Sequence, residues 1–224
     1  MKTKFFNKKE KENPAKFLGY IKLTDAFKKE GCAICRRINE ATFNYVDSLL
    51  YEDVNDQAIR EKLKASFGLC VKHSELLFKI GDALGTAIIY KNIVNVFLND
   101  LTNKPFNSFI KKDGCPVCIK EVEQMNSDIK IFIDFQKDDE FTDEFNSSDG
   151  LCAVHLQKLI EKVDSPEYKK YLINFHINKL NALIKDLDEL IRKFDYRFSH
   201  EKMTKNESRS WKHAVEFISG KKKD

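Results

Sequence analysis

The chain has 224 residues, of which 42% are hydrophobic and 33% are charged, so it can bury a substantial core in one domain or two small ones. With only 8 glycines and 4 prolines, a turn-rich sandwich or barrel is a poor expectation, and the composition favours a helical protein. The formal net charge of +4 permits nucleic-acid binding without requiring it.

Residues 1–20 form a basic N-terminal segment without the apolar stretch of a secretory signal. The most apolar stretch, residues 80–98, is interrupted by Asp82, Lys91 and Asn92, which disfavours a membrane span. We therefore expect a cytoplasmic protein that does not enter a membrane. In a reducing compartment, six cysteines serve better as metal ligands than as disulfides.

An internal repeat organises the sequence. The segment Ala26–Cys35 returns as Phe109–Cys118, and the segment Gly68–His73 returns as Gly150–His155. Each copy contains a CxxC motif followed later by a GLCxxH motif, and together the copies use every cysteine once. A lone CxxC would be weak evidence, but two copies with matched residue types, order and spacing strongly indicate a duplicated metal-binding unit.

The segments between these motifs have helical periodicity. We expect helices over residues 36–50, 57–66, 70–80 and 85–101, and the same plan in the second copy, with an acidic loop at residues 138–144. The first metal-binding repeat then covers residues 21–103 and the second covers residues 104–165, with Pro105 at the junction. The predicted fold is all-α.

A long helix is predicted over residues 166–198. Its apolar residues alternate in steps of four and three, as in a coiled coil: Ile173, Ile177, Leu180, Ile184, Leu187, Ile191, Phe194 and Phe198. This seam could pair with another helix of the same chain, which we favour, or form a homo-oligomer. A polar stretch over residues 199–210 precedes a short terminal helix with Trp211, and residues 166–224 are expected to pack with both repeats as one domain.

The motifs match the donor preferences of zinc, which binds four thiolate or imidazole ligands in a tetrahedron. CxxC supplies two sulfurs from a tight turn, and CxxH supplies sulfur and nitrogen from one face of a helix. We expect two sites, each within one repeat: Cys32, Cys35, Cys70 and His73 in the first, and Cys115, Cys118, Cys152 and His155 in the second. Four protein ligands close the coordination shell, so both zinc sites should be structural.

Two alternative functions remain open. Three cysteines and one histidine can also hold an iron–sulfur cluster, which would make this a redox or sensor protein. Basic residues beside the motifs could bind nucleic acid, although compensation of the thiolate charge explains them better: Lys28, Lys29, Arg36, Arg37, Lys72, Lys111, Lys112 and Lys120. Dithiol redox chemistry is disfavoured, because no βαβ context is present.

The sequence contains no recognisable catalytic motif, such as a P-loop, a nucleophile elbow or HExxH. His176, His200 and His213 have no partner cysteine and are interpreted as structural. We therefore expect no catalytic residues, and a scaffold, adaptor or regulatory protein that binds a protein partner.

The duplicated CxxC…GLCxxH units, together with Lys193–Phe198 and Ser210–Val215, resemble an uncharacterised bacterial family of helical proteins. The resemblance covers nearly the whole chain, and all eight candidate ligands are present. It implies a bacterial source and metal binding, and it brings no activity, substrate or partner.

Overall fold

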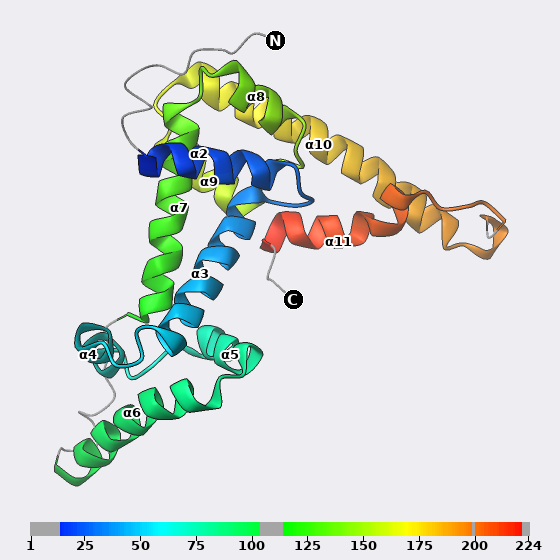
Figure 1. Ribbon diagram of the computed structural model, residues 1–224. Helices are drawn as coiled ribbons and strands as arrows, with labels where there is room; N and C mark the ends of the chain where they lie inside the picture. Colours follow the sequence, from blue (N-terminus) through cyan, green and yellow to red (C-terminus); the bar gives the residue numbers. More distant parts are fainter. Residues whose placement is uncertain (1–13, 104–113, 199, 221–224) are drawn as a thin grey trace. The chain divides into compact units, whose positions relative to one another are not determined.

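The computed structural model describes residues 14–103, 114–198 and 200–220, and within these ranges the chain forms helices and no strand (Figure 1). The prediction of an all-α protein is confirmed. The basic residues of the two termini, Lys111, Lys112 and Pro105 lie outside the described residues. Within the described ranges, no helix is long and apolar enough to cross a membrane.

Four helices of the first repeat correspond in order to four later helices. Residues of the first repeat form α2 (Pro14–Phe27), α3 (Ala33–Tyr51), α4 (Gln57–Ala65), α5 (Val71–Ile80) and α6 (Ala83–Asn103). The second repeat and the C-terminal region form α7 (Pro116–Asp134), α8 (Asp139–Asn146), α9 (Ala153–Lys162), α10 (Pro166–Lys193), the 3-10 turn η1 (Tyr196–Phe198) and α11 (Lys205–Ser219). The series α3 to α6 and α7 to α10 share their order, and α3 and α7 both have 19 residues.

The chain divides into two compact units whose boundaries do not follow the sequence repeats. Unit 1 contains residues 1–37 and 125–224, and unit 2 contains residues 38–124. Both boundaries fall inside long helices, one within α3 and one within α7. Each unit is therefore built from parts of both repeats.

The core of unit 1 is aromatic. Phe27 of α2 contacts Phe132 of α7 and Phe141 and Phe145 of α8, with ring centroids 5.3–5.6 Å apart in edge-on arrangements that aromatic pairs prefer. An ion pair that is almost fully buried joins Arg37, near the start of α3, to Asp128 of α7, with Nε and Oδ1 2.9 Å apart. The start of α3 is thereby fixed against the second half of α7.

The core of unit 2 is aliphatic. Val46, Leu49 and Leu50, from the last turns of α3, pack in one cluster with Val117 in the first turn of α7. Buried side chains of α4, α5 and α6 complete this cluster: Leu63, Leu77, Ile89 and Ile93. In unit 2, therefore, the end of α3 lies against the start of α7.

The structure differs from the predicted elements in two places. The acidic segment 138–144 is not a loop: Asp138 caps α8 by accepting a hydrogen bond from the backbone N–H of Phe141, and the next acidic residues lie in the first turn, where the helix dipole favours them. The terminal helix α11 begins at Lys205, inside the stretch predicted as polar and irregular. Thr204 and Glu207 form a reciprocal capping box there, which stabilises an early start.

The seam of the long helix packs within the chain only in part, because Leu180, Leu187 and Phe198 are partly buried. α10 ends at Lys193, and its buried side chains are Leu172, His176 and Leu190. Five seam residues are instead 41–76% exposed: Ile173, Ile177, Ile184, Ile191 and Phe194. The favoured prediction of intrachain packing is therefore wrong for these residues, because neighbouring helices cover a different face of α10.

Candidate metal centres

The eight predicted ligands gather into two clusters, but not in the predicted groups. In unit 1, Cys32 and Cys35 meet Cys152 and His155; in unit 2, Cys70 and His73 meet Cys115 and Cys118. The ligand-bearing atoms of each cluster all lie within 4.8 Å of one another. The expectation that each site lies within one repeat is wrong: the CxxC of each repeat pairs with the CxxH of the other.

The length of α3 and α7 explains the exchange. Each CxxC lies at the start of a helix of 19 residues, which extends for about 28 Å before the chain turns toward its own CxxH. In unit 1 the start of α3 lies against the second half of α7, so the nearby CxxH is the one that follows α7. In unit 2 the roles of the two helices are reversed.

Every pair of ligands sits at the N-terminus of a helix. Cys70 and Cys152 are the N-cap residues of α5 and α9, with nearly identical backbone angles, and each histidine follows three residues later. Cys32 and Cys115 likewise precede α3 and α7, and their carbonyls accept the first helical hydrogen bonds. Each centre is thus a meeting of two helix N-termini, whose dipoles stabilise thiolates.

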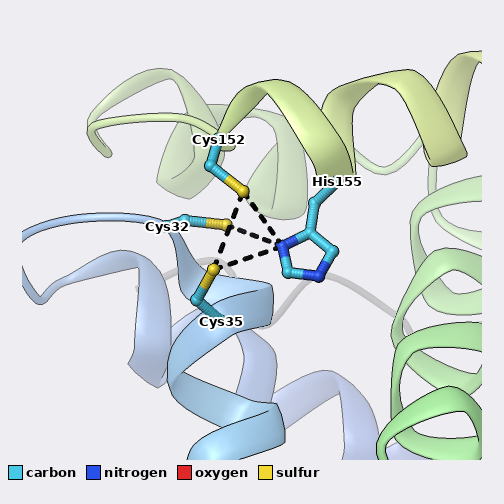
Figure 2. Close-up of side chains that lie close together, drawn as sticks. All are labelled: Cys32, Cys35, Cys152 and His155. Carbon is cyan, nitrogen blue, oxygen red and sulfur yellow. Dashed lines mark hydrogen bonds between the residues drawn. The ribbon is translucent and has the colours of Figure 1, made fainter. Parts of the chain in front are cut away.

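Figure 2 shows the unit 1 centre, with the three sulfurs and the Nδ1 atom of His155 directed toward one point. Nδ1 of His155 lies 3.4, 3.3 and 3.2 Å from the sulfurs of Cys32, Cys35 and Cys152. The sulfurs of Cys35 and Cys152 are 3.7 Å apart. In a tetrahedral zinc site the corresponding edges are about 3.5 Å for S···N and about 3.8 Å for S···S, given Zn–S of about 2.3 Å and Zn–N of about 2.0–2.1 Å.

The unit 2 centre has the same geometry. Nδ1 of His73 lies 3.2, 3.6 and 3.4 Å from the sulfurs of Cys70, Cys115 and Cys118. The sulfurs of Cys70 and Cys118 are again 3.7 Å apart. Both clusters could therefore hold a metal ion with their side chains as they stand.

Burial and the mutual contacts of the ligands shift their pKa values in both directions. Hydrogen bonds from Cys32 and Cys35 hold the pKa of Cys152 far below its usual value, while burial raises the pKa of Cys32. Although burial opposes it, hydrogen bonding to Cys152 and Cys35 raises the pKa of His155 to about 9. In unit 2, burial and the neighbouring Cys70 raise the pKa of Cys118 to about 12. A bound cation would displace these protons.

The unit 2 centre has a carboxylate behind its histidine. Nε2 of His73 lies 3.1 Å from Oε1 of Glu121, and the same oxygen accepts a hydrogen bond from Lys72 at 2.6 Å. Among the described residues Nε2 has no partner in hydrogen-bonding geometry, so Glu121 acts on the imidazole through its charge, which raises the basicity of the ring. Two of the four ligands in this centre, Cys70 and Cys118, are only partly buried.

The unit 1 centre is enclosed instead. All four of its ligands are buried. The backbone N–H of Gly31 donates to Asp149 at 2.7 Å, joining the loop before α3 to the loop before α9. Gly220, at the end of α11, has a φ of +77°, and a Cβ placed there would lie 3.3 Å from the sulfur of Cys35. A cavity of about 240 Å³ borders Cys32 and Cys152 and is lined also by α10 and α11.

His176, interpreted as structural from the sequence, supports the loop that carries Cys152. His176 accepts a hydrogen bond on Nε2 from the backbone N–H of Leu151 at 2.9 Å, and its Nδ1 lies 2.7 Å from the carbonyl of Leu172. In unit 2 the hydroxyl of Tyr90 lies at the corresponding place, 3.4 Å from the backbone N of Leu69. A histidine in unit 1 and a tyrosine in unit 2 thus accept the hydrogen bond from the residue before the CxxH cysteine. Because the two residue types differ, comparison of the repeats does not reveal this role.

The basic residues beside the motifs are mostly engaged by carboxylates or carbonyls. Arg37 is buried with Asp128, and Lys72 pairs with Glu121. The remaining pairs lie on the surface: Lys28 with Asp25 and Glu144, Lys120 with Glu123, and Arg36 with the carbonyl of Glu30. These described contacts are to carboxylates or carbonyls, and none of them is to a thiolate, which the sequence had suggested as the partner. Near the end of α10, Arg197 and Asp195 form a surface pair 2.7 Å apart.

The fold and these clusters define an all-α protein with an internal duplication and two exchanged three-cysteine, one-histidine centres. The model of a family of unknown function, DUF6062, matches the chain twice, at residues 15–113 and 107–224, and the chain belongs to this family. The two matches follow the sequence repeats, which confirms the duplication.

A relative of similar length is the uncharacterized 23.9 kDa protein in the xynA 3' region of Caldicellulosiruptor sp. (strain Rt8B.4). It is 30% identical over 202 residues, which cover 88% of this chain and 99% of the relative. No solved structure matches the chain.

Proposed function

We propose that each centre holds one zinc ion through three thiolates and one imidazole, so that the chain carries two structural zinc ions. The observation that carries this proposal is the set of distances between the donor atoms. They reproduce the edges of a zinc tetrahedron in both units, although different helices supply the ligands.

The donor set favours zinc over the alternatives. Soft thiolates disfavour magnesium and calcium, which bind oxygen. An iron–sulfur cluster attaches its protein ligands to different iron atoms and therefore spreads them apart. Here all donor atoms of a centre lie within 4.8 Å of one another, which is the spacing around a single ion.

Four protein donors leave no coordination position for water or substrate, so the proposed role of the metal is structural. Each ion would fasten segments that are far apart in sequence, such as Cys35 and Cys152, which are 117 residues apart. We infer a scaffold, adaptor or regulatory protein that binds a protein partner and works in a reducing compartment, where its six free cysteines remain available to metal.

Elemental analysis with an absorption spectrum tests the metal. On full-length protein purified without oxygen, we expect two zinc ions per chain and no visible absorbance. Iron with inorganic sulfide and visible absorbance would contradict the zinc proposal.

Metal removal tests the structural role. Complete removal should lower the helical signal in circular dichroism and the melting temperature. One ion would join the loops before α3 and α9 and the other the loops before α5 and α7, and each pair of loops would separate without its ion. Readdition of zinc should restore both signals. An unchanged spectrum and an unchanged melt in verified metal-free protein would show that the centres do not support the fold.

A further inference from the structure

The two centres contain equivalent pairs of cysteines. Each pair consists of the second cysteine of a CxxC and the cysteine of a CxxH, which is the N-cap of its helix. The sulfurs of Cys35 and Cys152 are 3.7 Å apart in unit 1, and the sulfurs of Cys70 and Cys118 are 3.7 Å apart in unit 2. The distance between the sulfurs therefore favours disulfide formation equally in the two units.

Exposure distinguishes the two pairs. In unit 2, Cys70 and Cys118 are only partly buried, and the residues that follow them, Val71 and Ile119, are 85% and 52% exposed. In unit 1, both cysteines of the pair are buried, and the residues that follow them are partly buried. A small oxidant in the solvent therefore reaches the unit 2 pair more readily than the unit 1 pair.

The unit 2 pair also has the chemistry that an oxidant requires. A thiolate is the reactive form of cysteine as well as the metal-binding form, and a bound metal ion keeps its cysteine ligands deprotonated. Cys70 caps α5, and Cys118 lies in the first turn of α7, so both sulfurs are at helix N-termini. Cysteines that react with peroxides are accessible thiolates beside a second cysteine that completes a disulfide.

We propose that Cys70 and Cys118 form an oxidation site at which hydrogen peroxide creates a disulfide and the unit 2 centre releases its ion. This site rests on the proposed function, because the bound ion supplies the thiolates. First, one thiolate attacks the peroxide, so an S–O bond forms, the O–O bond breaks and hydroxide leaves. Then the other thiolate attacks the oxidised sulfur, so the S–S bond forms and a second hydroxide leaves. The two sulfurs together lose two electrons, which the peroxide gains.

The disulfide changes unit 2 without separating its helices. The sulfurs approach from 3.7 Å to about 2.05 Å, and only His73 and Cys115 remain as ligands, too few for a closed zinc site. The disulfide joins the start of α5 to the start of α7, which the ion also joins when it is bound. Unit 2 therefore exchanges an ion for a covalent link, while unit 1 keeps its ion.

Peroxide treatment of the full-length protein loaded with zinc tests this site. A chromophoric chelator measures zinc release, and the same protein without peroxide is the control for release to the chelator alone. Mass spectrometry locates the disulfide after the remaining thiols are alkylated in denaturant. We expect rapid release of about one zinc ion per chain and a Cys70–Cys118 disulfide, with Cys35 and Cys152 alkylated. Release of the second ion should be at least about tenfold slower.

A variant tests the need for the second thiol. Cys70→His keeps four zinc ligands in unit 2 but removes the partner of Cys118, and elemental analysis verifies that two ions are bound. Peroxide should then release the unit 2 ion at least about tenfold more slowly than in the wild type. The position of the disulfide in the wild type is measured without any variant, so it decides the question even where Cys70→His binds metal poorly.

The outcomes separate this site from the proposed function. A wild type that does not hold two zinc ions would contradict the proposed function and the oxidation site with it. Two bound ions that peroxide does not release, or that it releases at equal rates, would overturn the oxidation site alone. Release with a disulfide between Cys115 and Cys118, or with no disulfide in unit 2, would overturn it as well.

Discussion

The two metal centres have the same donors and the same backbone plan, and they differ in what surrounds them. The unit 1 centre is buried, and the end of α11 lies against its sulfurs. The unit 2 centre leaves two cysteines partly exposed and places Glu121 behind its histidine. The position of Glu121 three residues after the CxxC is occupied by Ile38 in the first repeat. Donors and helix starts have thus stayed alike since the duplication, while the support for each centre has diverged.

This difference indicates two ways of holding the same ion. Unit 1 uses enclosure: Glu30 in the loop before α3 binds Arg209 of α11 at 2.6 Å, which fastens that helix beside the centre. Unit 2 uses electrostatics: Glu121 acts on His73 and is itself held by Lys72. Variants that change one centre and leave the other intact can test enclosure and electrostatic support separately.

The largest expected effect is the loss of one centre or of both. Cys35→Ser with Cys152→Ser removes two ligands from the unit 1 centre, so one metal ion per chain should remain after dialysis against a chelator that leaves two on the wild type. Cys35→Ser with Cys70→Ser removes one ligand from each centre, so both ions should be lost.

Elemental analysis distinguishes these outcomes. If each site lay within one repeat, the results for the two double variants would be interchanged. The comparison therefore tests the exchanged pairing directly, whatever the metal is.

The next effect concerns the carboxylate behind His73. Glu121→Gln should weaken metal binding at the unit 2 centre by roughly 10–100-fold and leave unit 1 unchanged, since it removes the charge that supports the imidazole. Competition titration with a chromophoric chelator measures this. Glu123→Gln is the control, because Glu123 pairs only with Lys120 among the ion pairs described here. An equal loss in both variants would mean that general surface charge governs affinity.

Release rates should differ between the centres by a smaller factor. An excess of chelator should remove the unit 2 ion on the order of tenfold faster than the unit 1 ion, because Cys70 and Cys118 are partly exposed and local opening is easier there. Arg209→Ala should speed release from unit 1 and narrow the difference. Stopped-flow absorbance would record two phases, and a single phase in the wild type would argue against distinct protection of the centres.

The sequence predicted the helical class, the duplication and the eight residues that cluster. These features depend on local signals in the sequence, namely hydrophobic periodicity, motif spacing and residue type, and each signal occurs twice because the sequence is repeated. The grouping of ligands was missed because it depends on how two long helices pack. The predicted helix over residues 36–50 already implied a separation of about 22 Å between its ends. The chain would have to return over this distance to bring the CxxH of the same repeat to its CxxC.

Support for the centres was harder to foresee. His176 lies beside the apolar seam of α10, and its role depends on a hydrogen bond from Leu151, 25 residues earlier. Tyr90 does the same task from a different residue type, so alignment of the repeats does not reveal it. The early start of α11 had a local signal in Thr204 and Glu207 that the polar composition concealed.

The smallest expected effect separates these two supports. His176→Phe leaves the buried N–H of Leu151 without its acceptor, and we expect the free energy of unfolding to fall by about 1–3 kcal/mol. Tyr90→Phe breaks a longer contact of 3.4 Å at a partly buried site and should cost less than about 1 kcal/mol. Urea denaturation of zinc-saturated protein at pH 7.5 measures both differences.

The same pair of variants gives a pH test. Burial lowers the pKa of His176 in the folded protein, so its contribution is complete above the unfolded pKa of about 6.5 and is lost as pH falls toward the folded value. The loss in free energy of unfolding caused by His176→Phe should therefore become smaller as the pH falls from 7.5 to 5.5. The loss caused by Tyr90→Phe should stay constant over the same range. Any acid effect on the metal ligands is shared by the three proteins and cancels in this comparison. A His176→Phe deficit that does not change with pH would mean that the ring acts through packing alone.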